Sequence, residues 1–407
     1  MRILWIKIGG LWPVDRGGRR RSFETVRALG ERHELTVATT HVADDDVAGL
    51  RGALPGSEVL SWPWQIPKHG SAGFALALGR SWASELPVDI WRCVVPGLRR
   101  EVTARLRRGA CDVCVVDFLA AAPNVSLRST RPLVLFSHNV EHQIWRRLAK
   151  VETRMVRRAL LEVEWRKMRR YEDRILGSVA RTIAVSEADR AMFASRVPGA
   201  SVCAVPTGVD LSYFRSEGAS EAPGSIVFVG AMDWYPNEDA VVHFAAEILP
   251  RVQRAVPDAT LTVVGRNPSA RLRALGPAVR VTGPVDDVRP HLGAASVVVV
   301  PLRVGGGTRL KIFEALAMQK AVVSTTIGAE GLPLQTGEHF VCADEPAAFA
   351  DLVVELLRDR ERRTALGVAG RRLVEARFGW AAVARAFERE LEEVHRARSS
   401  LRNGIRR

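Results

Sequence analysis

Short apolar runs, separated by amphipathic stretches, recur along the whole chain. The clearest run is Val297–Val300, four valines between Ser296 and Pro301, which is typical of a strand buried on both faces of a parallel sheet. Similar runs predict strands at residues 3–8, 35–40, 113–116, 133–136, 182–185, 202–205, 225–229, 261–264, 281–285 and 339–342. Because helical periodicity fills the intervening stretches, we expect an α/β fold with parallel sheets covered by helices.

A change in composition divides the chain into two parts. Residues 215–224 are rich in Ser, Glu, Gly, Ala and Pro and predict a linker. We therefore expect an N-terminal domain over 1–214 and a second domain over 225–376, followed by a last helix at 377–396 and a loose basic tail at 397–407. With 407 residues, of which 47% are hydrophobic and 26% charged, the chain is long enough for two cores.

The stretch after the four valines has the composition of a phosphate-binding turn. Gly305–Gly307 precede Thr308, a favoured helix N-cap residue, and an amphipathic helical pattern follows. A glycine turn at a helix N-terminus lets backbone N–H groups approach an anion, and Arg309 and Lys311 add two cations there. We expect Gly306, Gly307, Thr308, Arg309 and Lys311 to hold a phosphate group. The alternative is an ordinary strand-to-helix turn.

Glu314 lies on the same predicted helix, three residues after Lys311. Its carboxylate could accept hydrogen bonds from sugar hydroxyls. It could equally form a surface pair with Lys311, worth only about 0.2–0.5 kcal/mol.

Polar side chains also follow predicted strands in the N-terminal half. Asp117 ends the run at 113–116, and His138 and Asn139 follow the run at 133–136. If these strands are parallel, their polar ends meet at one edge of the sheet, where ligands bind in open α/β folds. Gly17 and Gly18 lie in the loop after the first strand. Paired glycines are common in turns, and a single histidine is more often structural than catalytic.

The block over 297–318 resembles the nucleotide-sugar site of retaining GT-B glycosyltransferases of the family 4 type. The resemblance implies two doubly wound, Rossmann-like domains facing a cleft, the first for the acceptor and the second for the nucleotide sugar. It also implies that the last helix crosses back to the N-terminal domain. It assigns Arg309 and Lys311 to the donor diphosphate and Glu314 to the ribose. Gly306 stands where many members carry a glutamate that contacts the donor sugar, so the donor is undefined.

The resemblance extends to other positions. The run His138–His142 resembles a family segment whose first histidine faces the donor sugar, and the loop with Gly17 and Gly18 resembles one that approaches the donor phosphates. The turn at Gly230 lacks the cation that many relatives carry, so Arg266 is a candidate third cation. Val285 falls on the loop that stacks against the nucleotide base in the family.

The activity that the resemblance implies is retaining transfer of a sugar from a nucleotide-diphosphate donor to a glycan, lipid-linked or natural-product acceptor. No DxD-like carboxylate pair stands beside the glycine block, so we expect neither a catalytic metal nor a cofactor. The departing phosphate oxygen could take the acceptor proton, with His138 orienting the sugar. A nucleotide-sugar epimerase or phosphorylase on the same fold is an alternative, as is an inactive scaffold, which Gly306 suggests.

The net charge of +14 favours anionic partners. No nucleic-acid-binding module is recognisable, so we expect no nucleic-acid partner.

Residues 141–176 predict one long helix with eleven Arg and Lys against six Asp and Glu. It could lie on an anionic membrane or be a solvated helix with a core stripe. Eight of the ten tryptophans precede residue 170 and could bind an acceptor or simply pack.

Cysteines and terminal segments narrow the cellular setting. Five cysteines do not suggest a disulfide framework, and Cys111 and Cys114 lie inside an apolar run, which favours core positions over a metal or redox site. The N-terminus lacks the pattern of a signal peptide, and no apolar run approaches the roughly 18 residues of a membrane span. We expect a cytoplasmic protein, with peripheral association at the inner face of the plasma membrane as an option.

Overall fold

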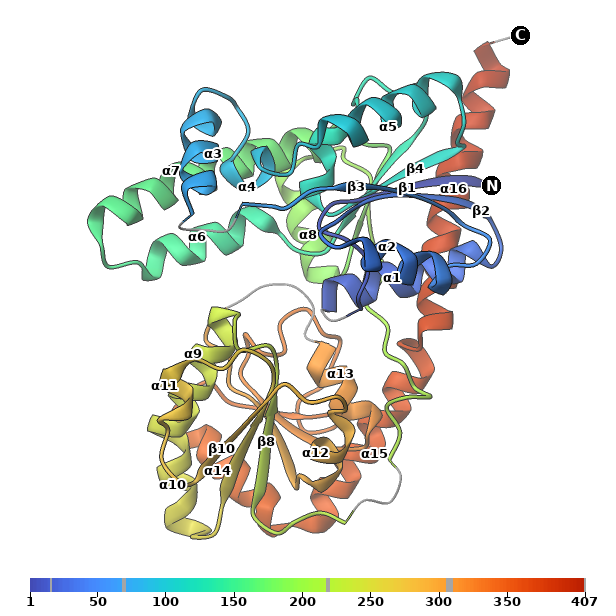
Figure 1. Ribbon diagram of the computed structural model, residues 1–407. Helices are drawn as coiled ribbons and strands as arrows, with labels where there is room; N and C mark the ends of the chain where they lie inside the picture. The colour runs from blue at the N-terminus through green and yellow to red at the C-terminus, as the bar shows by residue number, and fades with distance from the viewer. Residues whose placement is uncertain (15–16, 68–70, 217–219, 305–309, 406–407) are drawn as a thin grey trace. The chain divides into compact units, whose positions relative to one another are not determined.

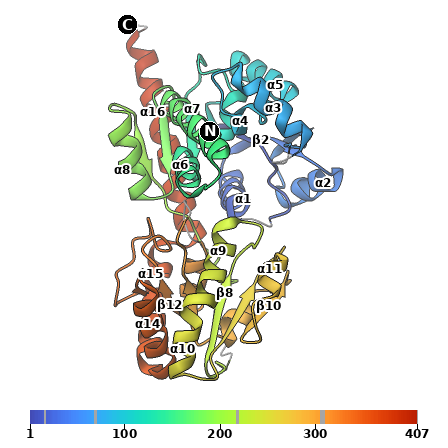
Figure 2. The same cartoon turned by 90° about the vertical axis from the view of Figure 1, so that its left-hand side faces the viewer.

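The structure, a computed structural model, describes residues 1–14, 17–67, 71–216, 220–304 and 310–405 (Figure 1). It comprises two compact units. Unit 1 contains Met1–Thr207 and Trp380–Arg407, and unit 2 contains Gly208–Gly379. Each unit is a parallel sheet with helices on both faces, which confirms the predicted pair of doubly wound, Rossmann-like domains (Figures 1 and 2).

Unit 1 is built on a seven-stranded sheet in the order β3-β2-β1-β4-β5-β6-β7. All its pairings are parallel. The order reverses between β1 and β4, which places the topological switch point at the carboxyl ends of these two strands. The strands are β1 (Arg2–Lys7), β2 (Glu34–His41), β3 (Glu58–Pro63), β4 (Val113–Asp117), β5 (Leu133–Ser137), β6 (Arg181–Ala184) and β7 (Val202–Ala204).

The helices of unit 1 cover both faces of this sheet. One face packs on α16, whose Phe387 ring lies 5.6 Å from that of Trp5 and 4.8 Å from that of Phe136, centroid to centroid. The helices are α1 (Gly17–Gly30), α2 (Asp44–Ala53), α3 (Ala72–Trp82), α4 (Val88–Trp91), α5 (Pro96–Arg108), the 3-10 helix η1 (Leu119–Asn124), α6 (Glu141–Val151), α7 (Met155–Leu176), α8 (Glu187–Arg196) and α16 (Trp380–Ile405).

Two expectations for helices in unit 1 were wrong. Residues 141–176 form a hairpin of two helices, α6 and α7, rather than one helix. The helix breaks where the Glu152 carboxylate accepts a hydrogen bond from the Arg154 N–H at 3.0 Å, a local bond that competes with helical pairing. The tail expected to be loose continues α16 to Ile405, since no proline interrupts the helical pattern.

Unit 2 is built on a six-stranded parallel sheet in the order β10-β9-β8-β11-β12-β13. Its switch point lies between β8 and β11. All four valines of β11 are buried, as predicted from their run. The strands are β8 (Ser225–Val229), β9 (Thr260–Val264), β10 (Val279–Gly283), β11 (Val297–Val300), β12 (Ala321–Ser324) and β13 (Val341–Cys342).

The helices of unit 2 connect these strands. They are α9 (Tyr235–His243), the π-helix η2 (Phe244–Ile248), α10 (Leu249–Ala255), α11 (Ala270–Arg273), α12 (Arg289–Ala294), α13 (Leu310–Ala317), α14 (Pro346–Arg358) and α15 (Arg360–Arg377). Val209 and Phe214 are buried in the core of this unit. Residues from 208 onward therefore belong to unit 2, seven positions before the expected linker begins at 215.

Candidate active site

In unit 2, backbone packs tightly on backbone at the carboxyl ends of β8 and β9. A Cβ atom built on Gly265 would lie 1.7 Å from the carbonyl oxygen of Gly230, so only glycine fits there. The N–H of Met232 donates to the carbonyl of Arg266 at 2.9 Å, which joins the two loops. Gly230 and Arg266, both predicted from the sequence, are thus neighbours at this edge.

Lys311 reaches this edge from α13. Its amine donates to the Asn237 side-chain oxygen at 2.7 Å and lies 4.1 Å from the centre of the Phe228 ring. Asn237 is itself buried, and its amide nitrogen donates to the Ala231 carbonyl at 2.8 Å. The lysine is therefore held beside the switch point of unit 2 by a neutral side chain with a fixed orientation.

Gly230 makes room for this pair. A Cβ on Gly230 would lie 2.7 Å from the Asn237 amide nitrogen and 2.9 Å from the Lys311 amine, both shorter than ordinary contacts. Asn237 did not emerge from the sequence analysis. The signal was available, since it is a polar residue in the first turn of α9, directly after the loop where a cation was sought and not found.

Other predicted residues of unit 2 lie in the loops after β9 and β10 or one turn along α13. Glu314 is half-buried on α13, and Val285 is half-buried after β10. The Nε atom of Arg266 lies 3.9 Å from a carboxylate oxygen of Asp233, in the loop after β8. The predicted residues Gly306, Gly307, Thr308 and Arg309 lie outside the described residues.

In unit 1, a buried polar cluster occupies the switch point. The Asp117 carboxylate, at the end of β4, accepts hydrogen bonds from the Trp5 indole at 2.9 Å and from His138 Nε2 at 2.7 Å. The Lys7 amine, at the end of β1, lies 3.6 Å from the same carboxylate. Arg21 of α1 approaches His138 Nδ1 at 3.0 Å. The structure thus brings together Asp117 and His138, as expected from their strand ends.

The hydrogen bonds of His138 define its tautomer. Asp117 accepts from Nε2, so this nitrogen carries the proton, and the Arg21 guanidinium can only donate, so Nδ1 accepts. Burial lowers the pKa of His138 to about 3, against the attraction of Asp117. The ring is therefore neutral near pH 7, and both nitrogens are engaged within the protein. Its expected contact with a donor sugar stays a prediction.

Burial also shifts the pKa values of the charged groups around His138. Burial lowers the pKa of Lys7 to about 8, partly opposed by Asp117. Burial alone would raise the pKa of Asp117, but attraction to Lys7 and His138 outweighs it and lowers that pKa to about 2. Burial lowers the pKa of Arg21 to about 10. Asp117 is therefore ionised near neutral pH, and Lys7 is mostly protonated.

Phe118 joins this cluster to the first helix. Its ring stacks on His138 with 3.6 Å between centroids, and the Lys7 amine lies 3.9 Å from its centre. Its φ of 70° is unusual for a residue with a side chain. A Cβ on Gly18 would lie 2.9 Å from the Phe118 ring, so Gly18 lets α1 approach closely. Helix α1 begins at Gly17, so Gly17 and Gly18 lie on its first turn rather than in the expected loop, and Gly17 itself is exposed.

Asn139 belongs to a separate network. Its amide donates to the Glu141 carboxylate at 3.1 Å, and burial raises the pKa of Glu141 to about 7. The Glu141 N–H donates to Glu172 at 2.8 Å, whose other oxygen lies 2.7 Å from His142 Nδ1. No direct contact joins Asn139 to the His138 ring among the contacts of the described residues.

Sequence reasoning missed four members of the unit 1 cluster, among them Trp5, which lies within the first strand. Lys7 ends a buried strand, the same signal that identified Asp117. Phe118 directly follows that aspartate. Arg21 lies in an arginine-rich run and had no signal of its own, because its partner His138 is 117 residues away.

The cysteines and the possible metal-ligand residues add no second site among the described residues. All five cysteines are free, and Cys111 and Cys114 are buried in the core, as expected. Within the described ranges, no group of three or more His, Cys, Asp or Glu residues could hold a metal ion. Across these same residues, no helix is long and apolar enough to cross a membrane.

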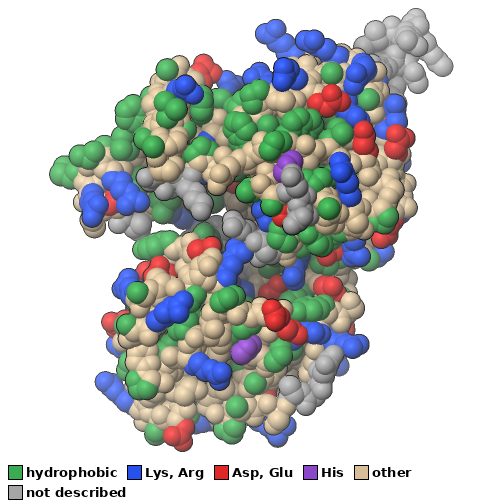
Figure 3. Space-filling view, viewed as in Figure 1, with side chains coloured by type: hydrophobic (Ala, Val, Ile, Leu, Met, Phe, Trp, Pro, Cys, Tyr) green, Lys and Arg blue, Asp and Glu red, His purple; other side chains and the backbone are tan. Residues whose placement is uncertain are grey.

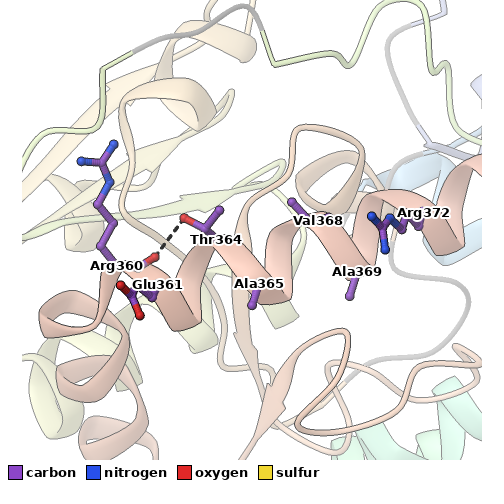
Figure 4. A pocket seen from close by; sticks show the side chains of 7 residues that line it. All are labelled: Arg360, Glu361, Thr364, Ala365, Val368, Ala369 and Arg372. Carbon is purple, nitrogen blue, oxygen red and sulfur yellow. Dashed lines mark hydrogen bonds between the residues drawn. The ribbon is translucent and has the colours of Figure 1, made fainter.

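A hollow of about 630 Å³ lies along α15 (Figure 4). All of its lining residues come from this one helix, between Arg360 and Arg372. The Thr364 hydroxyl already donates to the Arg360 carbonyl at 2.9 Å. The hollow contains none of the predicted site residues, and we assign no chemistry to it.

Family models and relatives agree on the type of protein. The model described as Glycosyltransferase Family 4 matches residues 16–213, and the model described as Glycosyl transferases group 1 matches residues 223–359. Phosphatidyl-myo-inositol mannosyltransferase from Mycobacterium tuberculosis is 31% identical over 215 residues, which cover 48% of this chain and 55% of that protein. The chain thus spans about half the length of this relative.

Solved structures share the fold. Sucrose-phosphate synthase from Thermosynechococcus elongatus superposes with a TM-score of 0.74 at 15% identity, covering 98% of this chain and 100% of that one. Anabaena HepE in complex with UDP and glucose superposes with a TM-score of 0.67 at 15% identity, covering 96% and 99%. At such identities the likeness shows the fold alone, which is GT-B.

A longer match comes from the GDP-mannose-dependent alpha-(1-6)-phosphatidylinositol monomannoside mannosyltransferase of Mycobacterium tuberculosis. It is 30% identical over 315 residues, which cover 70% of this chain and 78% of that protein. Together with the two family models, this match shows that the chain belongs to the family 4 glycosyltransferases, the glycosyl transferases of group 1.

Proposed function

We propose that this chain is a retaining, metal-independent glycosyltransferase that moves a sugar from a nucleotide-diphosphate donor to a glycan, lipid-linked or natural-product acceptor. The observation that carries the proposal is the position of the Lys311 amine, 2.7 Å from Asn237 and beside Gly230. These residues lie where β8 and β11 diverge, the edge at which α/β sheets bind nucleotides. A cation fixed at that edge suits a diphosphate.

In the proposed reaction, the acceptor oxygen bonds to the anomeric carbon on the face from which the diphosphate oxygen departs. The acceptor proton passes to the departing phosphate oxygen, so no separate base is required. Lys311, with Arg309, stabilises the negative charge that develops on the leaving group. Glu314 accepts hydrogen bonds from the ribose, and His138 orients the sugar.

GDP-mannose is the first donor to test. The relative that is 30% identical over most of its length is named as GDP-mannose-dependent. UDP-glucose comes second, because the solved structures with UDP and glucose share only the fold.

A lipid-linked acceptor is the first acceptor class to test. Two of the relatives are named for transfer to phosphatidylinositol or its monomannoside. We propose a cytoplasmic protein that associates peripherally with an anionic membrane, which the net charge of +14 supports. We propose no nucleic-acid partner and no cofactor besides the donor.

The test is a thermal-shift panel of GDP, UDP, ADP and dTDP, each with EDTA or with Mg²⁺. A ligand that binds only the native state stabilises it by RT ln(1 + [L]/Kd), so a micromolar site gives a measurable shift. We expect one nucleotide to raise Tm equally with and without Mg²⁺. No shift with any nucleotide would contradict the proposal.

Turnover separates the proposal from its alternatives. A transferase releases GDP from GDP-mannose mainly when a mannosyl-accepting lipid is present, whereas an epimerase turns over the donor without acceptor. An inactive scaffold binds the nucleotide and releases nothing. Retention is tested by NMR of the product, which should keep the anomeric configuration of the donor.

A further inference from the structure

The turn between α6 and α7 exposes large apolar side chains. Residues 153–159 are all exposed, and within them Met155 is 86% and Val156 77% accessible. We call these two residues the tip. Soluble proteins seldom present adjacent large apolar residues at the end of a projecting hairpin without a partner for them.

Positive charge surrounds the tip. Residues 146–158 contain six Arg and Lys residues and one acidic residue, Glu152, which is paired with Arg157 at 3.0 Å. Figure 3 shows hydrophobic and basic side chains side by side at the left edge of the view, where α6 and α7 meet in Figure 1. An apolar end within a basic collar is the composition of a segment that inserts into an anionic lipid interface.

One stripe of α7 continues from the tip. Val156, Val163, Lys167, Arg170 and Arg174 recur at spacings of three, four or seven residues, so they share a face of the helix. The stripe is apolar near the tip and basic further along. This order matches the depth profile of a bilayer surface, in which acyl chains lie below the phosphate groups.

A hollow of about 680 Å³ opens beside the basic part of this stripe. Trp82, at the end of α3 and 55% exposed, lines it together with Val163, Lys167 and Arg170. Lys167 already donates to the Ser81 carbonyl at 2.8 Å, and Arg174 pairs at 2.6 Å with Glu85, another lining residue. Arg170 is thus the lining cation that has no such partner among the described residues. An exposed indole beside the Arg170 guanidinium suits a lipid headgroup, with the arginine on the phosphate.

We infer that the tip, the α7 stripe and this hollow form one docking surface for an anionic phospholipid bilayer. Met155 and Val156 enter the acyl region, and Arg170 with its basic neighbours contacts lipid phosphates. The inference deepens the proposed function, because it explains how the enzyme would reach a lipid-linked acceptor.

The test is co-sedimentation of the full chain with vesicles of phosphatidylcholine alone or mixed equally with phosphatidylglycerol. We expect binding to the mixed vesicles only, with affinity falling as salt is raised. The double substitution Met155→Ser with Val156→Ser should weaken binding about tenfold or more. Val42→Ser is the matched control, because Val42 is also in unit 1 and is 70% exposed, and it should bind like the wild type.

A second pair of variants tests the charge. Arg170→Gln should weaken binding to the mixed vesicles about threefold or more. Arg372→Gln on α15 of unit 2 removes one arginine outside the surface and should not. Tm of each variant should match that of the wild type, since all these side chains lie at the surface.

Several results would overturn the inference. They are absence of vesicle binding, equal binding to both vesicle types, and equal effects of the tip and control variants. A concentration-dependent dimer that the tip variant abolishes would identify a second copy of the chain as the occupant instead. The GDP thermal shift, measured without vesicles, keeps this result distinct from a failure of the proposed function.

Discussion

Gly230→Ala tests the candidate donor site with a single methyl group. The new Cβ would lie 2.7 Å from the Asn237 amide nitrogen and 2.9 Å from the Lys311 amine. Ordinary contacts are about 3.5 Å, so both groups must move by roughly half an ångström or more. The lysine side chain is flexible and can move at small cost, whereas Asn237 is buried and bonded to the Ala231 carbonyl.

The expected effects on stability and binding differ in size. Overpacking of this kind costs about 1 kcal/mol or somewhat more in the free energy of unfolding. Loss of a charge-assisted hydrogen bond from Lys311 to the diphosphate costs about 1.5–3 kcal/mol of binding, which is about a tenfold to hundredfold rise in Kd. The variant should therefore fold and bind nucleotide poorly.

Isothermal titration with the nucleotide that shifts Tm most is the appropriate assay. Gly52→Ala is the matched control, because no heavy atom lies within 4 Å of a Cβ built there. Gly52 lies in α2, so its replacement should leave Kd unchanged and stabilise the fold by up to about 1 kcal/mol. If Gly230→Ala binds nucleotide as tightly as Gly52→Ala, the assignment of Lys311 to the diphosphate is refuted.

Three further predictions concern the charged residues of the two units. Lys311→Met should raise the nucleotide Kd about tenfold or more with little change in Tm; a normal Kd by titration would contradict its role. His138→Ala should reduce turnover far more than nucleotide affinity. It should also lower the free energy of unfolding by about 3 kcal/mol, because Asp117 and Arg21 lose a buried partner. Full activity would leave the histidine with a structural role only. The pKa of His138 is about 3 in the folded chain and near 6.5 when unfolded, so protons favour the unfolded chain below about pH 6.5. Wild-type stability should fall toward pH 4 by up to about 1.4 kcal/mol per pH unit more than that of His138→Asn, as measured by urea denaturation. Equal slopes would refute the lowered pKa, and with it the neutral state of the buried ring.

Local sequence patterns were sufficient to predict features that depend only on residues adjacent in the chain. Four consecutive valines identified β11, and a polar residue at the end of a buried run identified Asp117. The family resemblance then supplied the GT-B fold and placed the ligand at the carboxyl ends of the strands, with Lys311 among the residues named for it.

Contacts between distant residues could not be predicted from one sequence. Asn237 and Lys311 are 74 positions apart, and nothing local indicates that an asparagine would fix the lysine. Arg21 and His138 meet only because the sheet order places the helix after β1 beside the end of β5. The break between α6 and α7 contains neither proline nor glycine, and the hydrogen bond from the Arg154 N–H to the Glu152 carboxylate is visible only in the structure.

Unit 1 is built from two separate segments of the chain, and this affects how it folds during synthesis. Its sheet lies within the first 207 residues, but α16 covers one face of it from residues 380 onward. The ribosome therefore synthesises all of unit 2 before it makes Phe387 of α16, the residue that packs on Trp5 and Phe136. Until then that apolar face is open to chaperones, and a fragment that stops at residue 213, where the first family model ends, keeps it open permanently. Unit 2, by contrast, is one continuous stretch of the chain, Gly208–Gly379, so its core is complete before α16 is made.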